Sequence, residues 1–336
     1  MANLFPILNQ ESRLTGIARL ATQASPVGEG HMVEYKTLPV KSIMNRVVSS
    51  RELPFTLSIN PYRGCEFGCR YCYARYTHEF MELRRPQDFE RQIFVKQNAS
   101  WLLEQELRKH DPAESIAIGT ATDPYQPIER TAEITRALLQ VFAKRSGLRI
   151  GLITKSTLIE RDSTLLQQIA EKNYLTIHLT ITTTDTRLAR VLEPRAPRPD
   201  LRFRTVGRLR KAGLRVGISC APVLPAITDL PSALEAVVRA AAEARATSFF
   251  VQPLFLKASS KTVFDAFIAK EFPQLVEAYE ARYADSAFVT SQYRRTLAKQ
   301  VRDLCVKYGI RERSENREDL RPATPAPLQR NLFEAL

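Results

Sequence analysis

The chain has 336 residues, of which 44% are hydrophobic and 25% charged, values typical of a folded globular protein long enough to be an enzyme. The formal net charge is +13, because 49 lysines and arginines exceed 36 aspartates and glutamates. This excess favours polyanionic partners such as nucleic acid and is equally compatible with a basic enzyme that has none.

Five cysteines are too few, and odd in number, for a disulfide framework, which favours a reducing compartment. The sequence contains no run of eighteen apolar residues and no basic region followed by an apolar signal core. We therefore expect a cytoplasmic protein with no membrane partner.

The periodicity of the sequence changes near residue 53. Residues 1–50 show no sustained pattern and are expected to form an N-terminal extension that reaches the core near residues 41–46. Six apolar runs then alternate with amphipathic segments, as in repeated βα units with a parallel sheet. The runs cover residues 55–60, 115–120, 149–155, 175–182, 215–222 and 247–256. Six units are fewer than the eight of a closed barrel, so residues 51–260 predict an α/β fold, a partial (β/α)6 TIM-type barrel.

Helical patterns continue beyond the last predicted strand. Residues 263–283 and 288–308 read as helices of a C-terminal segment, 261–310, that closes the open side or the base of the barrel. Within the barrel, Ser232 to Glu235 form a capping-box pattern for one of the helices. Residues 311–336 are charged and then rich in proline, which predicts a disordered tail.

Three of the five cysteines lie in a CxxxCxxC run, Cys65, Cys69 and Cys72, directly after the first predicted strand. Three thiolates on one short loop can bind three irons of a 4Fe-4S cluster and leave the fourth iron without a protein ligand. A small molecule can take that position, whereas electron-transfer clusters normally have four cysteine ligands. A zinc site is the alternative, with His78 as the fourth ligand near in sequence.

The run 60–75, which holds these cysteines together with Tyr71 and Tyr73, resembles the signature loop of radical S-adenosylmethionine (SAM) enzymes. More narrowly, it is similar to the spore photoproduct lyase-like subfamily. The resemblance covers about residues 40–260 and implies a partial barrel, with a 4Fe-4S cluster and SAM as cofactors. It also implies reductive cleavage of SAM at the open iron, which yields methionine and a 5′-deoxyadenosyl radical that abstracts hydrogen from the substrate.

Candidate ligands follow the predicted strands, because the C-terminal strand ends of a parallel barrel converge on one mouth. Thr122 and Asp123 could accept from the α-ammonium of SAM, although an aspartate before a proline is equally typical of a turn. Lys155 ends an apolar strand, which favours an anionic ligand, and by the resemblance it would hold the methionine carboxylate or the ribose. Thr180 and Thr182 could bond the ribose, although threonine is also common in strands.

The resemblance also implies that Tyr71 and Tyr73 flank the cluster and that a cysteine returns hydrogen to the product radical. No cysteine occurs between Cys72 and Cys220, so the segment in which the lyase carries its donor lacks one. Cys220, near the end of the fifth strand, could substitute if it faces the mouth; packing in the core is the alternative. The sequence thus predicts the cofactor chemistry and leaves the substrate open.

The segment 187–215 is rich in arginine. Arg195 or Arg198 is a candidate for contact with a substrate phosphate, whereas Arg202, Arg208 and Arg215 fit solvated charges.

We expect a nucleic-acid substrate, in repair or base modification. The alternatives are a radical enzyme for a small molecule or protein, and a non-catalytic iron–sulfur module that binds the sliding clamp. A reductant such as flavodoxin or ferredoxin is a further expected partner. The segment from Gln329 to Phe333 resembles the QxxLF peptide with which replication and repair proteins bind the clamp, and a C-terminal turn packed on the core is the other reading.

Overall fold

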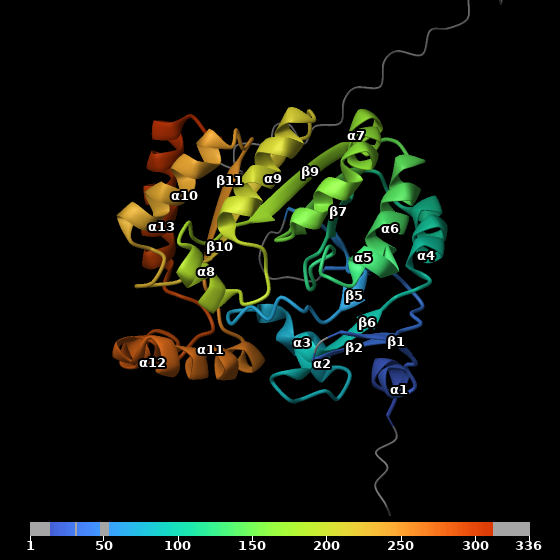
Figure 1. Ribbon diagram of the computed structural model, residues 1–336, viewed down its shortest axis with the longest axis horizontal. Helices are drawn as coiled ribbons and strands as arrows, with labels where there is room; N and C mark the ends of the chain where they lie inside the picture. The colour runs from blue at the N-terminus through green and yellow to red at the C-terminus, as the bar shows by residue number, and fades with distance from the viewer. Residues whose placement is uncertain (1–13, 31, 48–53, 312–336) are drawn as a thin grey trace, which may run out of the picture.

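Six parallel strands form the centre of the computed structural model, which describes residues 14–30, 32–47 and 54–311 (Figure 1). They are β4 (Leu57–Ile59), β7 (Ser115–Ile118), β8 (Arg149–Thr154), β9 (Tyr174–Thr180), β10 (Val216–Val223) and β11 (Phe249–Pro253). Each strand lies beside its predecessor, and β3 (Met44–Arg46) pairs antiparallel with β4 at one edge. Among the described residues the two edge strands, β3 and β11, do not pair with each other, so the barrel stays open and the predicted partial (β/α)6 barrel is confirmed.

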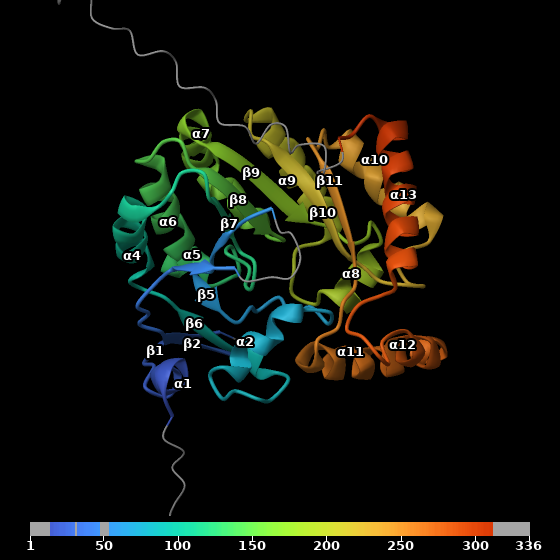
Figure 2. The same ribbon diagram turned by 180° about the vertical axis from the view of Figure 1, so that it is seen from behind.

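Helices cover the outside of this sheet (Figures 1 and 2). They are α4 (Ala99–Glu106), α5 (Glu129–Ala132), α6 (Ile134–Ala143), α7 (Ser163–Lys172), α8 (Thr186–Leu192), α9 (Pro199–Lys211) and α10 (Pro231–Glu243), with 3-10 turns η2 (Leu107–Lys109) and η3 (Thr157–Asp162). Strand alternation separates the core from the lumen. In β8, Leu152 is buried in the hydrophobic core, whereas Gly151 and Ile153 on either side of it line a central cavity.

A second, small sheet lies near the C-terminal ends of the barrel strands (Figures 1 and 2). Its order is β1 (Pro26–Gly30), β2 (Val33–Thr37), β6 (Gln92–Val95) and β5 (Tyr62–Arg63). Short helices accompany it: α1 (Gly16–Thr22), η1 (Tyr73–Arg75), α2 (Tyr76–Glu79) and α3 (Asp88–Arg91). The sequence did not predict this sheet, because strands of two to five residues carry too little periodicity.

The C-terminal helices are α11 (Ala258–Glu271), α12 (Val276–Arg282) and α13 (Ser291–Tyr308), with the turn η4 (Pro273–Leu275). Helix α13 packs against α10 and β11, while α11 contacts η1 and α2 at the end of the barrel where the cysteine run lies. The predicted capping box is wrong: the N-cap of α10 is Leu230, and Glu235 accepts hydrogen bonds from Lys307 and Tyr308. The proposed tail 311–336 lies, apart from its first residue, outside the described residues.

Within the described ranges, none of the helices combines the length and the apolar composition that a membrane span requires.

Candidate functional site

A cavity of about 1850 Å³ extends along the inside of the barrel and reaches the cysteine run. Most of the predicted site residues line it: Cys65, Cys69, Cys72, Tyr71, Tyr73, Thr122, Asp123, Lys155 and Thr180. Two do not, Thr182 and Cys220. The fold therefore brings together, around one cavity, residues at the ends of four different strands of the barrel or directly after them.

The first half of the cysteine loop is fixed by Gly64 and the polar residues around it. Gly64 has φ +82°, and a Cβ there would lie 2.8 Å from the carbonyl oxygens of both Gln92 and Phe89. This close approach lets the N–H of Cys65 donate to the Phe89 carbonyl at 3.0 Å. The carbonyl of Gly64 accepts from the hydroxyl of Thr122 at 2.5 Å. Only glycine fits this position without displacing the backbone of the second sheet.

The second half of the loop is anchored by elements distant in sequence. The N–H of Arg70 donates to the Leu192 carbonyl at 2.9 Å. The guanidinium of Arg75, ion-paired with buried Glu90, donates to the Cys69 carbonyl at 3.1 Å. The hydroxyl of Ser260, on α11, donates to the Cys72 carbonyl at 3.1 Å. Since these contacts use backbone groups of the loop, the three thiols remain available as ligands.

The thiols fit a metal cluster electrostatically. Burial raises the pKa of Cys65 well above its ordinary value and that of Cys69 to about 12, and it also raises the pKa of Cys72. Such thiols stay protonated unless a cation replaces the proton, which iron does. Among the described residues no three His, Cys, Asp or Glu side chains are placed to hold a single metal ion, whereas a cubane binds each thiolate to a different iron.

The zinc alternative required His78 as a fourth ligand, but the structure places this side chain outside the cavity that the three cysteines line. Its ring lies between Phe89 and Phe94, at centroid distances of 5.2 and 6.0 Å, and its Nε2 is 3.0 Å from the Gln92 carbonyl. His78 thus packs under the second sheet and does not line the cavity.

Replacing Gly64 by alanine is expected to destabilise the fold by more than about 2 kcal/mol, because left-handed strain of about 1–2 kcal/mol adds to the clash with two carbonyls. The matched control is Gly147→Ala, which has φ +78° and no atom within 4 Å of the added Cβ, so only the strain is expected. Urea unfolding and bound-iron analysis of both variants measure the difference. Equal losses in the two would show that the close approach at Gly64 has no energetic weight.

A buried network that the sequence did not predict lies beside the loop. The carboxylate of Glu193 accepts from the hydroxyl of Tyr71 and pairs with Arg202. Arg202 also donates to the carbonyls of Pro197 at 2.7 Å and Thr180 at 2.9 Å. Burial would raise the pKa of Glu193, but Arg202 and Lys155 outweigh it and hold that pKa below its ordinary value. The interpretation of Arg202 as a solvated charge is wrong, since its side chain is 1% exposed.

Three further arginines of this segment lie at the surface: Arg195, Arg198 and Arg208. Arg198 forms an exposed ion pair with Asp200 at 2.9 Å, and the guanidinium of Arg195 packs against Gly68 of the cysteine loop. Arg208 pairs with Glu160 at 2.7 Å.

Lys155 was predicted to bind an anionic group of SAM, and its ammonium is not used by a hydrogen bond within the described residues. Its Nζ lies 5.6 Å from the centroid of the Tyr71 ring, and within the described part of the chain it has no hydrogen-bond acceptor. Burial lowers its pKa, but Cys69 in the thiolate form that it has as a cluster ligand, together with the Glu193 carboxylate, outweighs that effect and raises it. The ammonium is therefore charged, positioned beside the cysteine loop and able to bind an anionic group of a ligand.

Thr122 and Asp123 already have structural partners. The Asp123 carboxylate accepts from the hydroxyl of Thr154 and the N–H of Lys155, each at 2.7 Å, and from the N–H of Tyr125 at 2.9 Å. Thr122 supports Gly64, as described above. A carboxylate can accept about four hydrogen bonds, so Asp123 keeps room for one ligand donor, and its role toward SAM stays a prediction.

Cys220 lies in the hydrophobic core, fully buried, with its Sγ 4.0 Å from the carbonyl of Thr182. Its neighbours Ser219 and Ala221 line the cavity instead, as strand alternation dictates. The geometry thus speaks against a role of Cys220 as hydrogen donor. Tyr73 does reach the cavity, where its hydroxyl donates to the Thr120 carbonyl.

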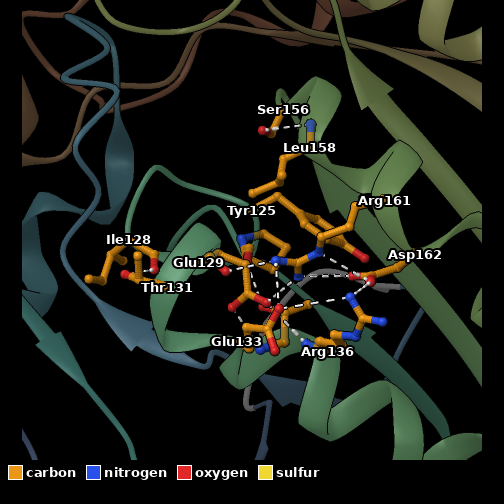
Figure 3. A network of polar contacts seen from close by, with 12 residues as sticks. Tyr125, Ile128, Glu129, Thr131, Glu133, Arg136, Ser156, Leu158, Arg161 and Asp162 are labelled. Atoms are coloured by element: carbon orange, nitrogen blue, oxygen red, sulfur yellow. Dashed lines mark hydrogen bonds and ion pairs between the residues drawn. The ribbon is translucent and has the colours of Figure 1, made fainter.

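A polar network between α5 and η3 fixes the start of the cysteine loop (Figure 3). Arg161 joins Glu129 at 2.9 Å and Asp162 at 3.1 Å, and Glu129 also accepts from the hydroxyl of Tyr62, three residues before Cys65. Glu129 is fully buried and also accepts from the N–H of Thr135 at 2.8 Å. The negative charge of Glu129 is thus paired with Arg161 and hydrogen-bonded, so we assign this network a role in stabilising the fold.

Comparisons with known proteins agree with this geometry. The family description "Radical SAM superfamily" matches residues 59–237, more than half of the chain. Uncharacterised proteins of Mycobacterium bovis and Mycobacterium tuberculosis are 32% identical over 333 residues, covering 96% of this chain and 95% of theirs. An uncharacterised protein of Methanocaldococcus jannaschii is 27% identical over 230 residues, 68% of this chain and 80% of that protein.

Solved structures of spore photoproduct lyase share the fold. A mutant form of that lyase, in which a cysteine is replaced by serine, aligns with TM-score 0.63 and 14% identity over 83% of this chain and 81% of that one. The lyase complexed with dinucleoside spore photoproduct aligns with TM-score 0.59 and 12% identity, with the same coverage. Because the family match spans the cysteine loop and most of the barrel, the chain belongs to the radical SAM superfamily, enzymes that use a 4Fe-4S cluster and SAM.

Proposed function

We propose that this radical SAM enzyme acts on nucleic acid, in repair or base modification. The observation that carries the proposal is a group of aromatic and cationic side chains that lines the cavity next to the cysteine loop. We define this group as the aromatic shelf: Tyr73, Tyr76, Phe80, Phe255, Lys257 and Phe288.

The rings of the aromatic shelf are arranged in two sets. Tyr73 and Phe255 have centroids 5.2 Å apart, and Phe255 stacks on Phe288 at 5.5 Å with an interplanar angle of 29°. Tyr76 meets Phe80 edge-on at 5.9 Å, and the Nζ of Lys257 lies 4.2 Å from the Tyr76 centroid. Aromatic faces beside cations suit nucleobases, whose stacking is worth about 1–3 kcal/mol per base. Phe80 is 59% exposed, which leaves its ring accessible to a ligand.

The charge around the cysteine loop supports the same substrate class. Exposed Arg187 and Arg190 lie on α8, and exposed Arg195 follows it, next to the loop. With the net charge of +13, these cations favour a polyanion. The fold similarity to spore photoproduct lyase, solved with a dinucleoside spore photoproduct, adds support. We do not extend the proposal to that lesion, because the described part of the cavity wall carries no thiol besides those of the cysteine loop.

In the proposed enzyme, Cys65, Cys69 and Cys72 hold the cluster. When bound, cluster and SAM together supply a 5′-deoxyadenosyl radical for abstraction of hydrogen from the substrate. Lys155 binds the carboxylate of the methionine group, and Asp123 accepts from its ammonium. The cavity walls orient the nucleotide and keep water from the reacting atoms.

Two partners are further proposals, one from this chemistry and one from the sequence. Reductive cleavage consumes one electron per event, so a low-potential donor such as flavodoxin or ferredoxin is required. The peptide from Gln329 to Phe333, which lies outside the described residues, would recruit the enzyme to the sliding clamp. Deletion of residues 329–333 would then remove clamp binding, and unchanged binding would reject this role.

Fluorescence anisotropy with single-stranded and duplex oligonucleotides, between about 50 and 200 mM salt, tests the substrate class. We expect affinity to fall steeply with salt. Phe80→Ala is expected to weaken binding by about 1–3 kcal/mol, because it removes one stacking face.

The matched control is Trp101→Ala, which removes an aromatic ring that is 61% exposed and does not line the cavity. We expect it to leave affinity unchanged. Absent or salt-insensitive binding by the wild-type enzyme would remove the nucleic-acid proposal and favour a small molecule or protein as substrate.

A further inference from the structure

Two cations of the cavity wall have no role in the chemistry described so far. Arg63 ends β5, and Lys96 directly follows β6. The two strands are paired, with Arg63 opposite Phe94, and the N–H of Lys96 donates to the Pro61 carbonyl at 3.3 Å. Both side chains line the cavity. The second sheet thus places two positive charges on one part of the wall.

Neither charge is neutralised within the part of the chain that the structure describes. Arg63 makes one hydrogen bond, from Nη1 to the Thr77 carbonyl at 3.4 Å, and its buried Nε has no acceptor. Lys96 is 4% exposed, and its Nζ donates to the Asn60 carbonyl at 2.6 Å, which leaves two of its three N–H groups without an acceptor.

Glu106 is the carboxylate that raises the pKa of Lys96, and it already accepts backbone hydrogen bonds. Glu106 accepts from the N–H groups of Ile43 at 3.0 Å and Met44 at 2.8 Å. Burial and, to a smaller extent, the charge of Arg63 lower the pKa of Lys96 to about 7, and Glu106 opposes them only weakly. Lys96 is therefore only partly charged near neutral pH in the free protein, because two buried like charges without a counter-charge are costly. An oxyanion bound between Lys96 and Arg63 would remove that cost and keep the ammonium charged.

These cations are distinct from those that act on the cysteine loop. The pKa values of the Cys69 and Cys72 thiols are raised mainly by burial and are lowered by Lys155, Arg75 and Arg202. Arg63 lies instead beside the aromatic shelf, because the carbonyl to which it donates belongs to Thr77, the residue after Tyr76. An anion bound by Arg63 and Lys96 would therefore lie close to a base stacked on that shelf.

We propose that Arg63 and Lys96 form a phosphate-binding subsite for the nucleotide whose base stacks on Tyr76 and Phe80. The forked guanidinium of Arg63 takes two phosphate oxygens, and the ammonium of Lys96 takes a third. This inference rests on the proposed nucleic-acid function. It identifies the two cations that bind the phosphate backbone of the nucleic acid. The subsite selects a charged internucleotide linkage over an uncharged one.

The test uses the full chain with its cluster reconstituted anaerobically, and two short oligonucleotides that differ at one linkage. One has a phosphate there and the other an uncharged methylphosphonate, and the position of the linkage is scanned along the oligonucleotide. At one position we expect the wild-type protein to prefer the phosphate by about tenfold or more. Arg63→Met and Lys96→Met are each expected to abolish most of this preference. The control Arg204→Met, in an exposed pair on α9 away from the cavity, is expected to retain it.

The outcomes separate the two proposals. If wild-type protein binds neither oligonucleotide, the nucleic-acid function fails. If it binds both equally at every scanned position, only the subsite fails. If Arg63→Met or Lys96→Met loses affinity for SAM and keeps the phosphate preference, the pair binds the SAM carboxylate and the subsite is rejected. Should the variants not fold, inorganic phosphate must still compete better with the phosphate oligonucleotide than with its methylphosphonate analogue on wild-type protein; equal competition overturns the proposal.

Discussion

Replacing Cys69 by alanine is expected to abolish cluster assembly and to reduce SAM cleavage by more than about 100-fold, since loss of an outer-shell partner of a metal ligand alone costs about 10–100-fold. The physical reason is that two thiolates, those of Cys65 and Cys72, cannot hold a cubane with three ligated irons. The measurements are iron and sulfide content after anaerobic reconstitution, and 5′-deoxyadenosine formed with dithionite.

The Cys69→Ala chain itself should still fold. The loop is held by its backbone, including the Cys69 carbonyl that accepts from Arg75 at 3.1 Å, and not by the thiol. Removing one buried sulfur costs far less than the stability of a domain. Circular dichroism and urea unfolding of the apoprotein should therefore resemble those of the wild type.

Cys220→Ala and Cys305→Ala are the matched controls, because both remove buried thiols that do not line the cavity. Both should keep the cluster and wild-type SAM cleavage. Cleavage retained in Cys69→Ala would contradict the assignment of the cluster ligands. A selective loss of substrate turnover in Cys220→Ala would restore Cys220 as a candidate hydrogen donor.

The barrel could be predicted from the sequence because its strands are continuous apolar runs. The fourth run, predicted at 175–182, appears as β9, Tyr174–Thr180, with its boundaries shifted by one and two residues. Buried parallel strands need apolar residues on both faces, so the signal is strong even in short windows. The cysteine run could be predicted equally well, because its three cysteines lie within eight consecutive residues.

The second sheet could not be predicted in the same way. Strand β5 has only two residues, and its partner β6 begins thirty residues later, so nothing local distinguishes either from a loop. This sheet nevertheless determines where Gly64 approaches the backbone and where Arg63 and Lys96 enter the cavity. Part of the site therefore depends on pairing between segments distant in sequence.

Burial of polar residues was the other feature that local patterns did not reveal. Asp123 was predicted as a ligand and is also the acceptor that holds the end of β8. Arg202 was read as a surface charge, although it falls on the same helical stripe as buried Val206 and Leu209. A charged residue on an apolar stripe signals a buried partner, and Glu193 is that partner.

Replacing Arg202 by methionine is expected to destabilise the folded state by about 3–5 kcal/mol, because Glu193 is then left buried without its ion-pair partner. Glu193→Gln combined with Arg202→Met removes both charges and should recover most of this loss. The matched control is Arg208→Met, whose pair with Glu160 has side-chain exposures of 66% and 26% and is expected to contribute at most about 1 kcal/mol. Urea unfolding at neutral pH compares the three variants.

The pH dependence of the Arg202→Met variant should change sign. In the wild type the pKa of Glu193 is below its ordinary value, so this group stabilises the fold at neutral pH and loses that contribution as the pH falls through about 4. Without Arg202, burial dominates and the pKa of Glu193 rises above that of the unfolded chain. The folded state then binds the proton more tightly, so the variant should lose stability, relative to wild type, as the pH rises from about 4 toward neutrality. A constant difference in unfolding free energy between wild type and variant across this range would show that Glu193 is not the group left unpaired.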